Sequence, residues 1–265
     1  MSESDPVTVV ISSLLKSGFP FQTAVAKAVQ EHSRWDFRAD LEEMPWRHPD
    51  GTDQFLDMVA IRDRYIVTIE CKKSLAQLTF LTPDVVDETQ TRESRCLFIR
   101  ADEAVIGSGV FEPAPKSHRS MYCCGNTQER PAQRLEGDIR MLLHGTNALA
   151  KELEKSKSDS DRVFVPVLVT TASLFTLAYD PNQVDIETGE LPPGVARDGL
   201  AEAPWVRFQK AFLAGDGGHR TVFVVHSGDL GTFLDRLEGG VKDAPRDIVY
   251  PRYLHLQFNP YNRHV

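Results

Sequence analysis

The first part of the chain changes from a helical pattern of apolar residues to an alternating one. Residues 6–16 and 21–32 carry apolar side chains at helical spacing, and Pro6 suits the first turn of the first helix. The apolar face of the second helix is formed by Phe21, Val25, Ala28 and Val29. Residues 35–42 then alternate apolar and polar side chains, which predicts a half-buried strand.

Two apolar runs that come next predict a β-hairpin. The stretch 47–53 contains Pro, Asp and Gly in sequence, as turns do. Strands are expected over 54–61 and 64–73, with a short polar turn between them. Two helices followed by three antiparallel strands are therefore expected here.

The middle of the chain contains a long amphipathic helix. Residues 95–100 predict a strand, and 103–112 predict a further strand or a loop. The helix is expected over 129–153. Its apolar stripe consists of Leu135, Ile139, Leu142, Leu143, Thr146, Leu149 and Leu153.

A nearly continuous apolar run over 162–172 predicts a strand that is buried on both faces. Residues 174–180 are expected to be its hairpin partner. Thr170 and Thr171 are expected to cap the end of the first strand rather than contact a substrate.

The C-terminal part combines a polar stretch with a second apolar run. Residues 180–203 are rich in Pro, Gly and acids and are expected to form a surface loop. A strand followed by a helix is expected over 219–240. Since no boundary between two domains is evident, we expect one α/β domain over 1–265, with a core at about 18–180 and a C-terminal strand–helix extension.

Composition narrows the classes of partner. The chain has 265 residues, 41% of them apolar and 26% charged, which is typical of a globular protein. No apolar run approaches the ~18 residues of a membrane span, and the N-terminus does not resemble a secretory signal. The four cysteines include no CxxC pair, so we expect free thiols and a cytoplasmic location. The net charge of −8 argues, on average, against binding nucleic acid through phosphates.

Charged residues in the predicted hairpin carry the candidate chemistry. Glu70 and Lys72 lie two residues apart and share one face of a strand, whereas Cys71 points to the other face with Tyr65, Val67 and Ile69. A short turn can bring Asp57, from the preceding strand, opposite Glu70. Two carboxylates suit Mg²⁺ or Mn²⁺, and a neighbouring lysine can stabilise charge on a phosphoryl group. This set is coherent for hydrolysis of a phosphodiester.

The same residues resemble the motif of the PD-(D/E)XK nuclease superfamily. "FLDMVA" resembles its first half and "IECKK" its second, as Asp57…Glu70-Cys71-Lys72. The resemblance implies a restriction-endonuclease-like fold, with a mixed central β-sheet flanked by helices. It also implies that Asp57 and Glu70 bind the metal together with the main-chain carbonyl of Cys71. Lys72 would be the catalytic lysine, and the products would carry a 5′-phosphate and a 3′-hydroxyl.

The resemblance covers roughly residues 18–75. The literal Pro49-Asp50 belongs to the turn before the strand, as does Asp53, so neither is the motif acid in this interpretation. The family often has another acid on the preceding helix. Gln22 stands at that position here and is the fourth candidate catalytic residue.

Basic residues supply a candidate nucleic-acid surface. Residues 116–157 hold eight Lys or Arg against five Asp or Glu. The candidates for contacting phosphates are Lys73, Lys116, Arg119, Arg130 and Arg134. The alternative is that these charges form an ordinary solvated helix face.

The leading hypothesis is a Mg²⁺- or Mn²⁺-dependent nuclease acting on DNA, with RNA as the alternative. By analogy of fold, we expect a homodimer or a subunit of a bacterial restriction or antiviral defence system. Three alternatives stay open. Glu70, Lys72 and Lys73 could simply end a strand at the solvent edge and pair on the surface. The chain could also be a nuclease-like scaffold that binds nucleic acid or a protein without cutting, or an acidic interaction protein with no role in binding nucleic acid.

Overall fold

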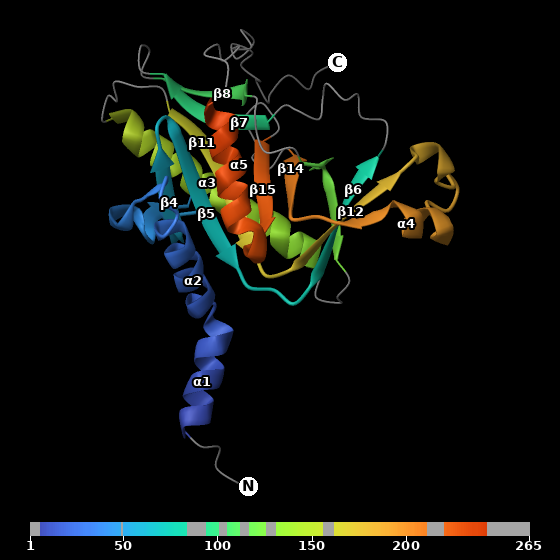
Figure 1. Cartoon of the computed structure of the whole chain (residues 1–265), viewed down its shortest axis with the longest axis horizontal. Coiled ribbons are helices and arrows are strands. Elements are labelled where there is room, and N and C mark those ends of the chain that lie inside the picture. Colours follow the sequence, from blue (N-terminus) through green and yellow to red (C-terminus); the bar gives the residue numbers. More distant parts are fainter. Residues whose placement is uncertain are drawn as a thin grey trace.

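The computed structural model describes residues 6–48, 50–83, 94–100, 105–111, 117–125, 131–155, 162–210 and 220–242 (Figure 1). Its helices are α1 (Pro6–Ser17), α2 (Phe19–Gln30), α3 (Pro131–Lys155), α4 (Pro193–Gly199) and α5 (Leu230–Lys242). The strands before α3 are β1 (Asp36–Phe37), β2 (Met44–Arg47), β3 (Asp53–Leu56), β4 (Met58–Arg62), β5 (Tyr65–Lys72), β6 (Gln77–Pro83), β7 (Ser94–Arg100), β8 (Val105–Phe111), β9 (Arg119–Ser120) and β10 (Tyr122–Gly125). Those after α3 are β11 (Arg162–Thr170), β12 (Ser173–Tyr179), β13 (Leu200–Glu202), β14 (Trp205–Lys210) and β15 (Arg220–His226).

A large mixed sheet organises these elements, so the expected mixed α/β class is confirmed. Its strand order is β1-β4-β5-β11-β15-β14-β9, and β7 pairs with the first residues of β11 and carries β8. β1, β4 and β5 are antiparallel, whereas β5, β11 and β15 run parallel. Parallel neighbours require a crossover, and α3 lies in the connection between β5 and β11.

Both faces of the central strands are buried, which explains their nearly unbroken apolar runs. One face packs against α3 through a cluster that includes Ile66, Phe164, Leu168, Ile139 and Leu142. The opposite face packs against α2 and α5 through Val67, Val165, Val29, Phe233 and Leu237. In Figure 1, α5 crosses in front of the central strands and α3 lies behind them. The expected stripe of α3 is confirmed, since five of its leucine and isoleucine positions belong to the first cluster, Leu135, Ile139, Leu142, Leu143 and Leu149.

A buried pair of threonines fixes α3 against β5. Thr146 donates its hydroxyl to the Leu142 carbonyl at 2.8 Å, so Thr68 is the donor in the 2.8 Å hydrogen bond between the Thr68 and Thr146 hydroxyls. As a crossover helix, α3 runs opposite to β5. Lys72 lies four residues beyond Thr68, about 13 Å along the strand. Asp138 lies eight residues before Thr146, about 12 Å along the helix. Because the two distances from the threonine pair are nearly equal and the helix runs opposite to the strand, Asp138 lies next to Lys72.

A second sheet extends the first at the ends of β5 and β11. Its order is β10-β6-β12-β13, with β6 and β12 parallel. Lys72 pairs with Thr170 in the large sheet, and Gln77 pairs with Ser173 in the second. Four residues therefore connect β5 to β6, whereas two connect β11 to β12. The longer connection, 73–76, leaves space at this junction.

Three sequence predictions are corrected by this architecture. Residues 35–42 contain the two-residue strand β1 and a 3₁₀ turn, Ala39–Leu41, instead of one strand. β12 is not the hairpin partner of β11, because the chain keeps its direction after Thr171 and enters the second sheet. The stretch 180–203 contains a 3₁₀ turn (Pro181–Gln183), α4 and β13, so it is only partly a loop.

The two threonines at the end of β11, Thr170 and Thr171, cap the strand end as expected. Thr170 accepts the Ala172 N–H through its hydroxyl at 3.1 Å. The Thr171 hydroxyl accepts the Ser74 N–H at 2.8 Å and donates to the Ser74 carbonyl at 2.7 Å. These bonds cap the strand end and tie the connection 73–76 to β11.

Substitutions at two glycines of α3 are expected to have opposite effects on stability. A Cβ on Gly145 would stand 3.1 Å from Trp46 Nε1 and 3.4 Å from Leu56 Cδ1, so the β2–β3 hairpin packs directly on this position. We expect Gly145→Val to lower the free energy of unfolding by about 1–3 kcal/mol. Gly137 has nothing within 4 Å of such a Cβ, and Gly137→Ala is the matched control, with an expected gain of up to ~1 kcal/mol. Urea unfolding measures both, and equal effects would contradict the close packing at Gly145.

The helices of the described residues include none long and apolar enough to cross a membrane.

Candidate active site

Asp57 stands at a junction between two strands. The expected single strand over 54–61 is split, because β3 pairs with β2 and β4 pairs with β5. Continuing the pairing of Met58 with Ile69 by one residue places Asp57 opposite Glu70, on the face that α3 covers. Asp57 Oδ2 accepts the backbone N–H of Cys71 at 2.7 Å, which fixes the orientation of this carboxylate.

Glu70 is a buried acid near the end of β5, with 8% of its surface exposed. Burial, followed by the charge of Asp57, raises the pKa of Glu70 to about 7, although Lys72 opposes the shift. A carboxylate in this position costs free energy unless a cation neutralises it.

Lys72 lies between Glu70 and an acid from α3. Its ammonium is 2.8 Å from Glu70 Oε1 and 3.5 Å from Asp138 Oδ1. Burial alone would lower the pKa of Lys72, but Glu70, Asp138 and Asp57 together raise it. Lys72 therefore stays protonated at neutral pH. Burial also raises the pKa values of Asp57 and Asp138 above the ordinary range of aspartate.

Gln22 reaches this cluster indirectly. Its side-chain amide donates to Glu43 Oε1 at 3.5 Å, and the charge of Glu43 contributes to the raised pKa of Asp57. Glu43 is a left-handed residue with φ 48°, and its N–H donates to the Asp57 carbonyl at 3.0 Å. α2 therefore places Gln22 at the edge of the acids, with Glu43 between it and Asp57.

The donor chemistry of the cluster fits a hard divalent cation. Asp57, Glu70 and Asp138 present carboxylate oxygens around one ammonium, and all three have raised pKa values. Among the described residues, no group of three or more His, Cys, Asp or Glu side chains is placed so that it could hold a metal ion. Mg²⁺ does not require one, because it commonly keeps several waters and takes one or two carboxylates.

Cys71 is compatible with only part of the role that the resemblance implies. Its thiol packs with the cluster on the α2 and α5 face, away from Glu70, and burial raises its pKa. The thiol is thus a neutral group on the wrong face for this site. The main-chain carbonyl, which the motif interpretation invokes, is the remaining donor of this residue.

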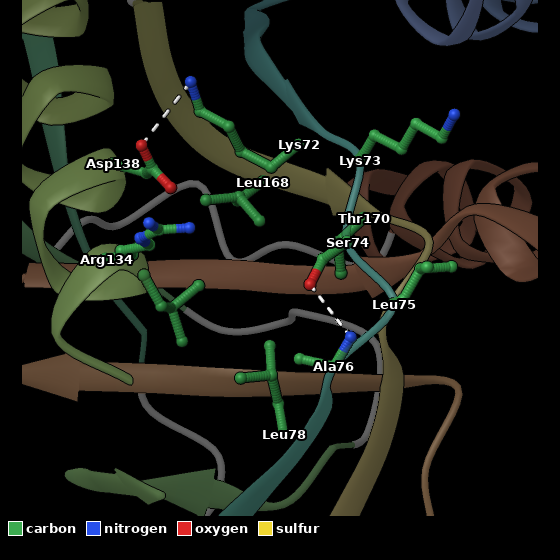
Figure 2. Close-up of a pocket in the computed structure, with 11 residues that line it drawn as sticks. Lys72, Lys73, Ser74, Leu75, Ala76, Leu78, Arg134, Asp138, Leu168 and Thr170 are labelled. Carbon is green, nitrogen blue, oxygen red and sulfur yellow. Dashed lines mark hydrogen bonds and ion pairs between the residues drawn. The ribbon is translucent and has the colours of Figure 1, made fainter. Parts of the chain in front are cut away.

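A pocket opens beside Lys72. It has a volume of about 540 Å³ and is lined by the connection 73–76, the first turns of α3 and the end of β11. Figure 2 shows Lys72 and Asp138 linked along one side, with Arg134 beside them on α3 and Lys73 directed away from the cavity.

The residues predicted to contact nucleic acid do not all lie near the acid cluster. Lys73 and Arg134 belong to the lining of this pocket. Arg119 lies on β9 at the far edge of the large sheet, with β11, β15 and β14 between it and β5, so it is not brought to the acid cluster. Lys116 and Arg130 lie outside the described residues.

Sequence reasoning missed Asp138 and Glu43. A signal for Asp138 exists in the helical pattern, because this acid lies three residues after Leu135 and four before Leu142, within the apolar stripe. An acid in that position either is buried or faces a polar site. Glu43 has no comparable signal, since it is one of several acids in a polar turn.

Comparison of the chain with protein-family models, with curated proteins and with solved structures finds no match.

Proposed function

We propose that this protein is a metal-dependent nuclease of the PD-(D/E)XK type. The observation that carries the proposal is the convergence of Asp57, Glu70 and Asp138 around Lys72, on one face of the sheet and next to a pocket. The order of elements supports it, since α2, the antiparallel strands β4 and β5, the crossover helix α3 and the parallel strand β11 correspond to a restriction-endonuclease-like core.

Each residue of the acid cluster would have a distinct role in hydrolysis. Asp57 and Glu70 would hold Mg²⁺ or Mn²⁺, with Asp138 at the same cluster. The bound metal would supply a nucleophilic water and neutralise charge on the phosphoryl oxygens. Lys72 keeps its proton at neutral pH, so it stabilises negative charge that develops on the phosphate rather than acting as a general base. The hydrogen bond from Cys71 to Asp57 holds the acid in place before substrate binds.

The proposed substrate is DNA, with RNA as the alternative, and the proposed products carry a 5′-phosphate and a 3′-hydroxyl. A place in a bacterial restriction or antiviral defence system, in the cytoplasm and as a homodimer or a subunit, belongs to the same proposal. Its basis is analogy with proteins of this fold.

Cleavage assays that compare replacement of a site acid with replacement of a surface acid test the proposed function. Circular and linear DNA, and RNA, are incubated with the protein and either Mg²⁺ or Mn²⁺. We expect cleavage by the wild type and a loss of about 100-fold or more in Asp57→Asn, because this carboxylate faces the proposed metal. Asp53→Asn is the control, since Asp53 lies four residues before Asp57 on β3, is exposed and pairs with Arg47 at the surface. Equal cleavage by Asp57→Asn and wild type would overturn the proposal.

A scaffold without catalysis is the second candidate, and one observation favours it. Gln22 stands where the family often has an acid, and its side-chain amide donates to Glu43 Oε1 at 3.5 Å. Calorimetric titration with Mn²⁺ separates the two functions. A nuclease binds the metal through Asp57, whereas a scaffold shows no divalent-metal site that Asp57→Asn removes.

A further inference from the structure

The pocket beside Lys72 is continuous with the candidate active site. Lys72 and Asp138 belong both to the acid cluster and to the lining of the pocket. The connection 73–76, which is two residues longer than the connection from β11 to β12, lines the cavity. The hydrogen bonds of Thr171 to both backbone groups of Ser74 hold this longer connection in place, so the cavity is preformed.

The lining has an apolar part and a charged part in which two cations stand beside one acid. Ala76, Leu78, Leu135 and Leu168 form the apolar part, and all four are buried. Lys72, its ion-pair partner Asp138 and Arg134 form the charged part, and in Figure 2 the Arg134 side chain extends from α3 toward Leu168. Ser74 and Thr170 add hydroxyl groups. A volume of about 540 Å³ is in the range of small-molecule sites.

These features suit an amphipathic ligand that carries an apolar group and an anionic group. A nucleotide has both, since its base can lie against aliphatic side chains and its phosphate can pair with arginine and lysine. Because Lys72 contacts Glu70 at 2.8 Å, a phosphate held by Lys72 stands directly beside the proposed metal site. This is where the scissile phosphate of a nuclease substrate must lie.

We propose that the pocket holds one unstacked nucleotide of the substrate strand, next to the bond that is cut. The inference rests on the proposed function and deepens it by naming the substrate class, which is a single-stranded or locally unpaired polynucleotide. A paired base remains stacked within its duplex and must be extruded before it can enter such a pocket, whereas an unpaired base enters without this cost.

Binding without metal tests the pocket independently of hydrolysis. A fluorescein-labelled 12-nucleotide single strand, the matching duplex and a free nucleoside 5′-monophosphate are titrated in EDTA, with anisotropy and competition as readouts. We expect the single strand to bind at least about tenfold more tightly than the duplex. Arg134→Ala should weaken single-strand binding about tenfold, because it removes the guanidinium from the pocket. Lys151→Ala is the matched control, as an exposed cation on the same helix away from the pocket.

Filling the cavity provides a second variant. Ala76→Phe places a ring in the apolar part and should abolish the preference for the single strand, while circular dichroism reports whether the variant folds. Should it fail to fold, Arg134→Ala on the helix surface still decides the question. Wild-type affinity in folded Ala76→Phe or in Arg134→Ala, or equal affinity for strand and duplex, would overturn the inference. Tighter binding of the monophosphate than of the strand would instead assign the pocket to a free nucleotide and also overturn it.

The outcomes separate this inference from the proposed function. Pocket-dependent binding of single strands by a protein that cleaves nothing would support the pocket and remove the nuclease proposal. Cleavage that depends on Asp57, by a protein that binds duplexes as well as single strands, would remove only the pocket inference.

Discussion

Replacing Glu70 by glutamine is expected to abolish hydrolysis and to make the metal-free protein more stable at pH 8. Both effects follow from the buried position of the Glu70 carboxyl group beside the proposed metal site. The pKa of Glu70 is raised from 4.5 to about 7 in the folded protein, chiefly because burial disfavours the carboxylate. The folded state therefore binds this proton more tightly than the unfolded state does.

The sign of the pH dependence follows from this difference. The stabilising contribution of protonated Glu70 is fully present below pH 4.5 and is lost as the pH rises through about 7. The difference between these pKa values corresponds to roughly 3 kcal/mol as an upper bound. Glutamine does not titrate, so Glu70→Gln should be more stable than the wild type by about 1–3 kcal/mol at pH 8, and by much less at pH 5.

Urea unfolding of the metal-free proteins at pH 5 and pH 8 measures this effect. Glu202→Gln is the control, because Glu202 is exposed on β13 and its replacement should change stability little at either pH. Mn²⁺ should stabilise the wild type at pH 8 and leave Glu70→Gln unchanged. A variant that is less stable than the wild type at pH 8 would contradict the burial of an anionic Glu70.

Much of the secondary structure could be predicted because its periodicity is strong and local. The helical spacing in α2 and α3 and the strongly apolar runs of β5 and β11 each favour one type of element at their length. The direction of β12 could not be predicted in the same way. Thr171 and Ala172 are compatible with a hairpin turn and with a continuing chain, and only pairing with β6 decides between them.

The residues of the candidate site likewise differ in whether their positions could be predicted from the sequence. Glu70 and Lys72 could be placed on one face from residue parity, and Asp57 could be placed opposite Glu70 from the length of the hairpin. Asp138 is 66 residues beyond Lys72 in the chain, and its position depends on the tie between Thr68 and Thr146. The orientation of Gln22 toward Glu43 likewise depends on the left-handed turn at Glu43, which no period in the sequence indicates.

Replacing Lys72 by methionine should act on metal binding and stability in the opposite direction to Glu70→Gln. The substitution removes the ammonium that stands 2.8 Å from Glu70 and 3.5 Å from Asp138, and it leaves the three carboxylates facing one another. The Lys72 side chain is 39% exposed, so solvent screens part of this effect. We expect the metal-free protein to lose about 1–2 kcal/mol of stability at pH 8, which is below the cost of breaking a fully buried pair.

Binding of Mn²⁺ should reverse the loss of stability in Lys72→Met. Because a divalent cation no longer competes with an ammonium, Lys72→Met should bind Mn²⁺ more tightly than the wild type and should gain more stability from it. Hydrolysis should still fall about 10²- to 10⁴-fold, since no ammonium remains to stabilise charge on the phosphate.

Urea unfolding and calorimetry with Mn²⁺, together with the cleavage assay, measure these three effects. Lys73→Met is the matched control for stability, because Lys73 is the next residue and its side chain points away from the cavity in Figure 2. Its replacement should change the free energy of unfolding by less than about 0.5 kcal/mol. If Lys72→Met instead weakened Mn²⁺ binding, Lys72 would hold the acids in place for the metal, and its ammonium could not be the group that the metal displaces.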